Sequence, residues 1–194
     1  MGSACGLSSH GEYAAKHNPF VFFNDVNGWD GSAFHPEQRC NAHVVDYAQL
    51  DTDLAANTLP KYAFITPNLM DDMHDGTIAE GDAWLARELP KILGSEAFNH
   101  GGIVFLLWDE GSGLTPGDDP PFIAISANAK GGYVSTIDYD TSSYLLTVEK
   151  MLGLAPLPCG GSDAATIPSM DDLFSVSLTA PGTSTSNTGT GSGG

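Results

Sequence analysis

An unbroken run of apolar residues, Ile103 to Trp108, leads directly into two carboxylates, Asp109 and Glu110. A continuously apolar segment of this length is typical of a strand that other elements cover on both faces. Such strands occur in α/β proteins, where helices flank a mostly parallel sheet. Ligands in these folds bind beyond the carboxyl ends of the strands, so the run also directs the search for a site to the residues that follow it.

Two other apolar segments are expected to join this strand in one sheet, Tyr62 to Thr66 and Phe122 to Ser126. The second is almost continuously apolar, which again favours a strand covered on both faces. Strands that alternate with helical patterns predict an α/β layer structure with a mostly parallel sheet flanked by helices. We expect Ile103 to Trp108 to be its central strand.

Two segments have the periodicity of helices. The clearer one runs from Ser142 to Leu152, where leucine and valine side chains recur on one stripe; Thr141 or Ser142 can cap its start and Gly153 can end it. The other runs from about Glu80 to Leu93, and Pro90 is expected to kink or shorten it.

The charge balance excludes one class of partner. The chain has 24 acidic and 7 basic residues, a formal net charge of −17, and so negative a surface repels the phosphate backbones of nucleic acids. We therefore expect no nucleic-acid binding. No apolar run approaches the roughly 20 residues of a bilayer-spanning helix, so no transmembrane segment is expected, and residues 1–5 lack the apolar region of a secretory signal.

The C-terminal segment 175–194 is uncharged and ends in Ser, Thr and Gly residues, which predicts a flexible linker after a domain over residues 1–174. The three cysteines, Cys5, Cys40 and Cys159, allow at most one disulfide and one remaining thiol. Cys5 and Cys40 are either bridged or both free thiols.

Candidate chemistry follows two of the predicted strands. Residues 67–76 contain His74 among three carboxylates, and Asp109 and Glu110 follow the central strand. Two adjacent carboxylates repel each other unless a cation neutralises them, and a hard divalent metal ion suits their oxygens. The plainer alternatives are that Asp109 caps a turn while Glu110 points to solvent, and that His74 is a surface-loop histidine. His17, beside the stiff Asn18-Pro19 pair, is a further candidate.

Six segments in order carry a resemblance to a known family. They are Lys16-His17-Asn18-Pro19-Phe20, Arg39-Cys40 with His43-Val44-Val45, Phe64-Ile65-Thr66-Pro67-Asn68, Asp72-Met73-His74-Asp75, Gly81-Asp82-Ala83-Trp84-Leu85 and Trp108-Asp109-Glu110-Gly111. This series resembles the phosphoesterase family, which groups acid phosphatases with bacterial non-specific phospholipases C in an alkaline-phosphatase-like α/β fold. The resemblance continues to Phe174 and so covers nearly the whole chain before the tail.

The resemblance implies metal-assisted hydrolysis of phosphate esters. By matching position, Asp109 and Glu110 become ligands of a divalent metal ion of unknown identity, and His17 and His74 become catalytic groups that contact the phosphate or transfer protons. The implied substrate is a small phosphate ester or a phospholipid head group. The family and the tail also imply a secreted or cell-surface protein.

Two departures from the family pattern set apart the rival hypotheses. A Glu-Asn pair and a Ser or Thr nucleophile, which the family carries before the HNPF segment, have no counterpart here, so the chain resembles the C-terminal half of a phosphoesterase. Thr141 stands where relatives often carry a histidine. The alternative is therefore a catalytically inactive acidic fragment or cation-binding module. A secreted carbohydrate- or surface-binding domain is a third hypothesis, supported by the tail alone.

The family hypothesis makes a geometric prediction. The carboxylates of Asp109 and Glu110 should lie at the same mouth of the sheet as the imidazoles of His17 and His74, all within about 10 Å, which is the reach of a phosphate and one metal ion.

Overall fold

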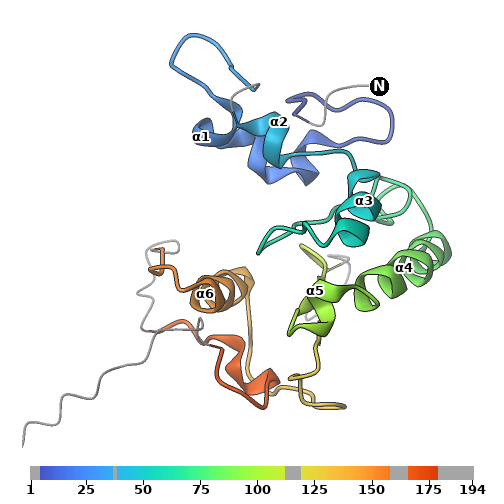
Figure 1. The fold of residues 1–194 in the computed structure, drawn as a ribbon, viewed down its shortest axis with the longest axis vertical. Coiled ribbons are helices and arrows are strands. Elements are labelled where there is room, and N and C mark those ends of the chain that lie inside the picture. The colour runs from blue at the N-terminus through green and yellow to red at the C-terminus, as the bar shows by residue number, and fades with distance from the viewer. Residues whose placement is uncertain (1–4, 37–38, 112–118, 158–165, 179–194) are drawn as a thin grey trace, which may run out of the picture. The chain divides into compact units, whose positions relative to one another are not determined.

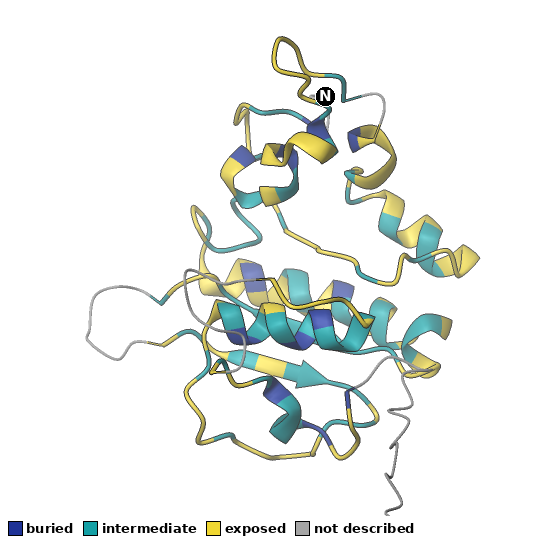
Figure 2. Cartoon of the chain, turned by 90° about the vertical axis from the view of Figure 1, so that its left-hand side faces the viewer, coloured by how far each residue is buried: buried dark blue, intermediate teal, exposed yellow. Residues whose placement is uncertain are grey.

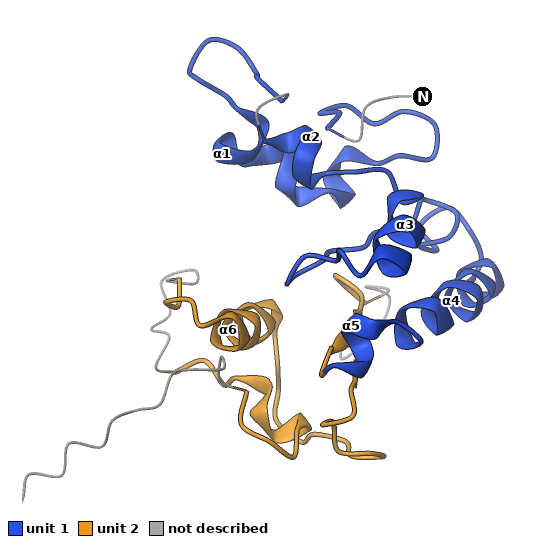
Figure 3. Ribbon diagram, in the orientation of Figure 1, with its two compact units in different colours: residues 1–100 blue, residues 101–194 orange. Residues whose placement is uncertain are grey.

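The computed structural model describes residues 5–36, 39–111, 119–157 and 166–178. The chain divides into two compact units, residues 1–100 and residues 101–194 (Figure 3). In chain order the described elements (Figure 1) are the 3-10 helices η1 (Ala15–His17) and η2 (Pro19–Phe22), the helices α1 (Asn24–Asn27), α2 (Cys40–His43), α3 (Gln49–Ala56), α4 (Ile78–Leu93) and α5 (Glu96–Asn99), the strands β1 (Val104–Leu107) and β2 (Phe122–Ile125), helix α6 (Thr141–Leu152) and the 3-10 helix η3 (Met170–Leu173). The mixture of helices and strands agrees with the predicted class in its coarse form.

A disulfide between Cys5 and Cys40 ties the start of unit 1 to helix α2. Of the two alternatives that the sequence left open, a bridge or two free thiols, the structure shows the bridge. Cys40 and Val21 have no exposed surface, and Leu7, Val26 and Val44 pack around them. The bridge thus forms the core of the region that carries the His17 segment.

Helix α4 begins at Ile78, two residues before the predicted start at Glu80, because Thr77 caps it. The Thr77 hydroxyl accepts a hydrogen bond from the Glu80 backbone, and the Glu80 carboxylate accepts from the Thr77 backbone, which forms a capping box. The helix ends at Leu93, as its periodicity predicts, so of the two expected effects of Pro90 the shortening does not occur. Pro90 lies in the last turn, where the helix loses one backbone hydrogen bond and ends before further turns would be disturbed.

The glutamate Glu88 is buried on α4, with 4% of its surface exposed. Its carboxylate accepts hydrogen bonds from Lys91, Arg87 and Tyr47 at 2.8, 2.6 and 2.9 Å. Lys91 also contacts Asp51 on α3 at 3.1 Å, so the cluster joins the two helices. The hydrogen bond from Lys91, helped by those from Arg87 and Tyr47, outweighs burial and lowers the pKa of Glu88 to about 2.

The sheet of unit 2 differs from the expected one. Strands β1 and β2 lie side by side, but they are antiparallel, with Val104 opposite Ile125 and Leu107 opposite Phe122. The expectation of parallel neighbours is therefore wrong for this pair. Parallel pairing needs a crossover that is usually helical, and the described part of the connection between β1 and β2 contains no helix. The strands are also half-buried rather than buried, as Figure 2 shows, because the described sheet has two strands and both are edges.

The segment Tyr62 to Thr66 lies in unit 1 and forms no strand. Its apolar side chains are largely open, with Phe64 46% exposed and Ile65 36% exposed. Phe64 contacts the ring of Phe20, with 5.5 Å between the centroids. A strand needs a hydrogen-bonded neighbour, and no described segment of unit 1 pairs with this one.

Helix α6 confirms the predicted helix within one residue. Asp140, rather than Thr141 or Ser142, is its cap and accepts a hydrogen bond from the Ser143 backbone at 2.9 Å. Gly153 ends the helix in the left-handed conformation, as predicted. Its buried residues are Ser143, Thr147 and Glu149 rather than those of the predicted leucine and valine stripe. The Thr147 hydroxyl accepts a hydrogen bond from the Met170 backbone of η3.

The core of unit 2 is aromatic. The ring of Phe105 on β1 lies 5.4 to 6.2 Å from the rings of Phe122, Tyr144 and Phe174. Within the predicted linker, Ser175 donates a backbone hydrogen bond to Asn128, and Leu178 is buried, so these two residues anchor the start of the segment to this unit. Residues 179–194 lie outside the described residues.

Candidate functional site

The His17 segment and the His74 loop meet in unit 1. His17 ends η1, and η2 follows directly after Asn18, with Pro19 as its first residue. The backbone N–H of Leu69 donates to the carbonyl of Glu12 at 3.0 Å. This bond joins the stretch just before His17 to the loop that carries His74.

Short-range hydrogen bonds hold the loop of residues 67–76. The Asn68 side chain accepts from the backbone N–H groups of Met70 and Asp71 at 3.0 and 2.9 Å. The backbone N–H groups of Asp75 and Gly76 donate to the carbonyl of Leu69. A β-carbon on Gly76 would lie only 2.0 Å from the Met70 carbonyl oxygen. The close approach of two backbone segments therefore requires glycine at this position.

The two predicted catalytic histidines lie next to each other. The centroids of the His17 and His74 rings are 5.4 Å apart, and the rings are tilted by 61°. His17 Nδ1 lies 3.0 Å from Asp72 Oδ2, and His74 Nδ1 lies 2.7 Å from Asp75 Oδ1. Each imidazole therefore uses its Nδ1 atom on a carboxylate. The side chain of His17 is 23% exposed and that of His74 is 49% exposed, so both remain accessible to a ligand.

This arrangement suits an anionic ligand. A hydrogen bond between Nδ1 and a carboxylate orients the ring and leaves Nε2 for another partner. Among the residues described, no hydrogen bond occupies Nε2 of His17 or of His74. Two such atoms on neighbouring rings could donate hydrogen bonds to the oxygens of one phosphate or transfer a proton to a leaving alkoxide.

Asp72 and Asp75 were not predicted as site residues, although both belong to the segment Asp72-Met73-His74-Asp75. The sequence does contain a signal, since three carboxylates flank His74 within four positions. The partner of Asp72 is His17, which lies 55 residues away along the chain. Sequence spacing alone could not connect them.

Asp109 and Glu110 lie in unit 2, just beyond the end of β1. Both are exposed, and neither makes a hydrogen bond or ion pair with the residues that the structure describes. Two carboxylates at the end of a strand fit a hard divalent cation in charge and in donor type. They are two ligands of the six or so that such an ion takes, and the described residues include no group of three potential ligands. The convergence of this pair with the two histidines stays a prediction.

Thr141 occupies the first turn of α6 and is exposed. Its hydroxyl has no acid or base function near neutral pH. In unit 2 it therefore offers none of the chemistry that an imidazole would offer at the same position.

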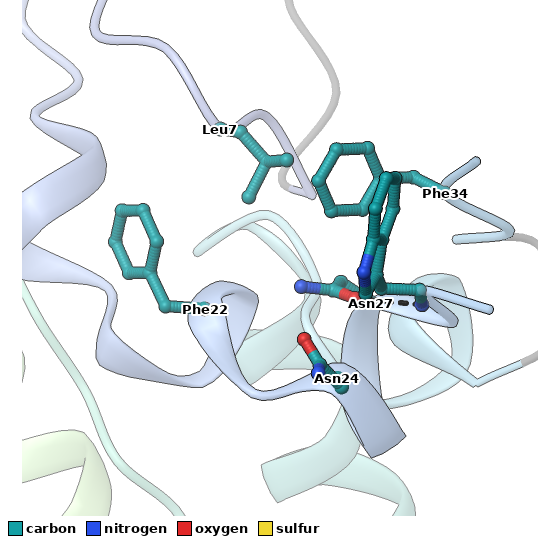
Figure 4. Close-up of a pocket in the computed structure, with 6 residues that line it drawn as sticks. Leu7, Phe22, Asn24, Asn27 and Phe34 are labelled. Atoms are coloured by element: carbon teal, nitrogen blue, oxygen red, sulfur yellow. Dashed lines mark hydrogen bonds between the residues drawn. The ribbon is translucent and has the colours of Figure 1, made fainter. Parts of the chain in front are cut away.

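A cavity in unit 1 is lined by other residues. It measures about 320 Å³ and is lined by Leu7, Phe22, Asn24, Asn27, Trp29 and Phe34 (Figure 4). The Asn27 amide is buried and already bonded to the Val21 carbonyl at 2.8 Å. None of the four predicted site residues lines this cavity, and its walls hold no titratable side chain.

A sequence model of the phosphoesterase family matches residues 8–155. The chain belongs to the phosphoesterase family. The matched residues include His17, His74, Asp109 and Glu110.

Curated relatives carry the names of phosphatases. The chain is 36% identical over 111 residues to a phosphate-repressible acid phosphatase of Penicillium chrysogenum, a match that covers 57% of this chain and 25% of that protein. It is 31% identical over 148 residues to a phosphatidylinositol-3-phosphatase of Mycobacterium tuberculosis, covering 76% of this chain and 44% of the relative. A probable acid phosphatase of Kluyveromyces lactis is 32% identical over 99 residues, covering 51% and 22%. The chain thus spans less than half the length of each relative. No solved structure matches it significantly.

Proposed function

We propose that this phosphoesterase chain forms part of a site that hydrolyses phosphate esters. The observation that carries the proposal is the pair of neighbouring imidazoles, His17 and His74, each bonded through Nδ1 to a carboxylate. Membership of the phosphoesterase family and the names of the relatives support the same reaction class.

In this proposal His17 and His74 hold the phosphate through their Nε2 atoms. An imidazolium donates hydrogen bonds to the equatorial oxygens of the phosphate, and one of the two can protonate the leaving oxygen. The carboxylates of Asp72 and Asp75 stabilise the positive charge that an imidazolium carries. The segment from Lys16 to Phe20 contains no serine, threonine or cysteine. The proposal therefore assigns no nucleophile to it.

Asp109 and Glu110 are proposed to hold a divalent metal ion, which when bound would neutralise charge on the phosphate oxygens. Their two carboxylates suit Mg²⁺, Ca²⁺ or a similar hard ion. Both are free of internal ion pairs among the described residues, so no protein cation competes for them. A lysine or arginine paired with Asp109 or Glu110 would instead indicate a structural ion pair.

We infer that the complete domain has the mostly parallel, alkaline-phosphatase-like sheet, with further strands beside β1, because the relatives are longer than this chain. The substrate is proposed to be a small phosphate ester or a phospholipid head group, and the relative named a phosphatidylinositol-3-phosphatase supports the second choice. Secretion is supported by the Cys5–Cys40 disulfide, since such bridges persist in oxidising compartments. No helix among the described residues is long and apolar enough to cross a membrane.

Calorimetric titration with Mg²⁺ and with Ca²⁺ tests the metal ligands. Asp109→Ala is expected to abolish divalent-ion binding, because it removes half of the charged donor pair. The matched control is Asp119→Ala, which removes an exposed carboxylate from the same unit. Equal binding by both variants and by the unchanged chain would contradict the assignment of Asp109.

Hydrolysis of p-nitrophenyl phosphate, with and without a chelator, tests the reaction. Turnover that the chelator stops supports metal-assisted hydrolysis by the chain itself. Metal binding without turnover favours the alternative of a non-catalytic cation-binding module. A parallel assay with bis(p-nitrophenyl) phosphate distinguishes a monoesterase from a diesterase.

A further inference from the structure

One carboxylate, that of Asp72, contacts both histidines of the candidate site. Its Oδ2 atom lies 3.0 Å from His17 Nδ1, and its Oδ1 atom accepts the backbone N–H of His74 at 2.8 Å. The two contacts use both oxygens of the group. Asp72 therefore links the side chain of one imidazole to the backbone that carries the other.

The backbone around Asp72 is held in a costly conformation. Met73, the residue between Asp72 and His74, has φ of +73°, which is unfavourable for a residue with a β-carbon. Helix α4 packs closely here, since a β-carbon on Gly81 would lie 2.4 Å from Met73 Cγ and 3.0 Å from the Asp71 carbonyl oxygen. Such conformations persist where the surrounding structure over-determines them. The Asp72 side chain is also shielded, with 15% of it exposed.

The contact with His17 decides which ring nitrogen carries the proton. An ionised carboxylate accepts hydrogen bonds and donates none, so His17 Nδ1 must be the donor. In the neutral ring, Nε2 is then the unprotonated nitrogen, and in the charged ring Nε2 is a donor pointing away from Asp72. In both states Nε2 faces away from Asp72 and stays available to another partner.

We propose that Asp72 is the positioning residue of this site, which sets the tautomer of His17 and the backbone position of His74 together. The proposal rests on the proposed function for its catalytic consequence only. Asp75 is the corresponding partner of the His74 ring, through its contact at 2.7 Å, but it has 55% of its side chain exposed and touches one histidine. Asp72 alone among the described carboxylates contacts both.

Nitrogen-15 NMR of the full chain with labelled histidines tests the proposal, because the two tautomers give distinct ring-nitrogen shifts. In the unchanged chain, His17 is expected to carry its proton on Nδ1. Asp72→Asn places an amide that can donate opposite Nδ1, so His17 should change to the tautomer protonated on Nε2. The variant is isosteric, and its amide oxygen can still accept the His74 N–H. A His17 tautomer that is the same in Asp72→Asn and in the unchanged chain would overturn the proposal.

Three further variants complete the test. Asp71→Asn is the matched control, because it removes the adjacent carboxylate, and His17 should keep its tautomer. Asp75→Asn should alter the His74 ring and spare His17. Asp72→Ala removes the acceptor of the His74 backbone N–H, so hydrogen exchange at that amide should become faster. Signals of the buried Val21 methyl groups show whether the variant is folded. In a folded Asp72→Ala variant, an unchanged exchange rate at the His74 amide would contradict the link between Asp72 and His74.

Titration with inorganic phosphate separates this proposal from the proposed function. Phosphate should shift the Nε2 signals of both histidines, and Asp72→Asn should weaken that response. If phosphate leaves both rings unaffected in the unchanged chain while the tautomer responds to Asp72→Asn, the phosphate site is refuted and the positioning role stands. Where the chain hydrolyses p-nitrophenyl phosphate, Asp72→Asn should lower kcat by about 10- to 100-fold with a smaller change in KM, and Asp71→Asn should leave both unchanged.

Discussion

Replacing the buried Glu88 by glutamine is expected to destabilise unit 1. The carboxylate is 4% exposed and accepts three hydrogen bonds, two of them from the cations Lys91 and Arg87. Glutamine keeps the size and the acceptor oxygen but loses the charge. The two cations then lose their charged partner, while Lys91 keeps its ion pair with Asp51 on α3.

The expected magnitude follows from the pKa of Glu88. Lowering that pKa from the ordinary value of 4.5 to about 2 corresponds to about 3 kcal/mol of preference for the ionised form in the folded state. Lys91 and Arg87 are 40% and 58% exposed, so solvent screens both ion pairs. Allowing for that screening, we expect Glu88→Gln to lower the free energy of unfolding by about 1 to 2 kcal/mol at neutral pH.

The effect should depend on pH in a defined direction. Because the folded-state pKa of Glu88 is lowered, its contribution is complete above about pH 4.5 and is lost as the pH falls toward about 2. Urea unfolding followed by tryptophan fluorescence measures it, since Trp84 on α4 has its ring 5.5 Å from that of Tyr47. The control is Glu96→Gln, which removes an exposed carboxylate and should cost less than about 0.5 kcal/mol. Equal stability of Glu88→Gln and the unchanged chain at neutral pH would refute the reasoning.

Two further predictions concern the scaffold of the His17 and His74 segments. The double variant Cys5→Ser, Cys40→Ser should lose about 4 kcal/mol, as loop-closure entropy gives for a bridge with a sequence separation of 35 residues; calorimetric melting measures the loss, and three reactive thiols in the denatured, unreduced chain would refute the bridge itself. Gly76→Ala should destabilise the His74 loop by about 1 to 3 kcal/mol, because the new methyl group meets the Met70 carbonyl at 2.0 Å. The matched variant Gly131→Ala has open space around it, and equal urea midpoints for the two would contradict the packing argument.

The sequence predicted the two long helices well because their signals are local. The periodicity of α6 and the glycine after it lie within about a dozen neighbouring residues, and Gly153 indeed ends the helix in the left-handed conformation. The same holds for α4, although its capping box at Thr77 extended the helix beyond the predicted start. The short helices α1, α2 and α5, of four residues each, have too little periodicity to be recognised.

The pairing of strands could not be determined in the same way. The apolar character of Val104–Leu107 and Phe122–Ile125 predicted two strands, and both formed. The same character also predicted a strand at 62–66, which has no partner among the described residues of its unit. A strand exists only through hydrogen bonds to a neighbour, so its presence and direction depend on which other segment lies beside it.

In the candidate site, too, some features follow from local sequence and others from long-range contacts. The sequence by itself determined the family and the residue types, because the motifs around His17, His74 and Asp109 are contiguous and occur in order. Only the tertiary structure decided that Asp72 contacts both His17 and His74 and that Cys5 pairs with Cys40. It also decided that Glu88, on a helix with charged neighbours, is buried. Each of these outcomes depends on contacts between segments about 35 to 55 residues apart in the chain, whose free energy no local pattern of residues encodes.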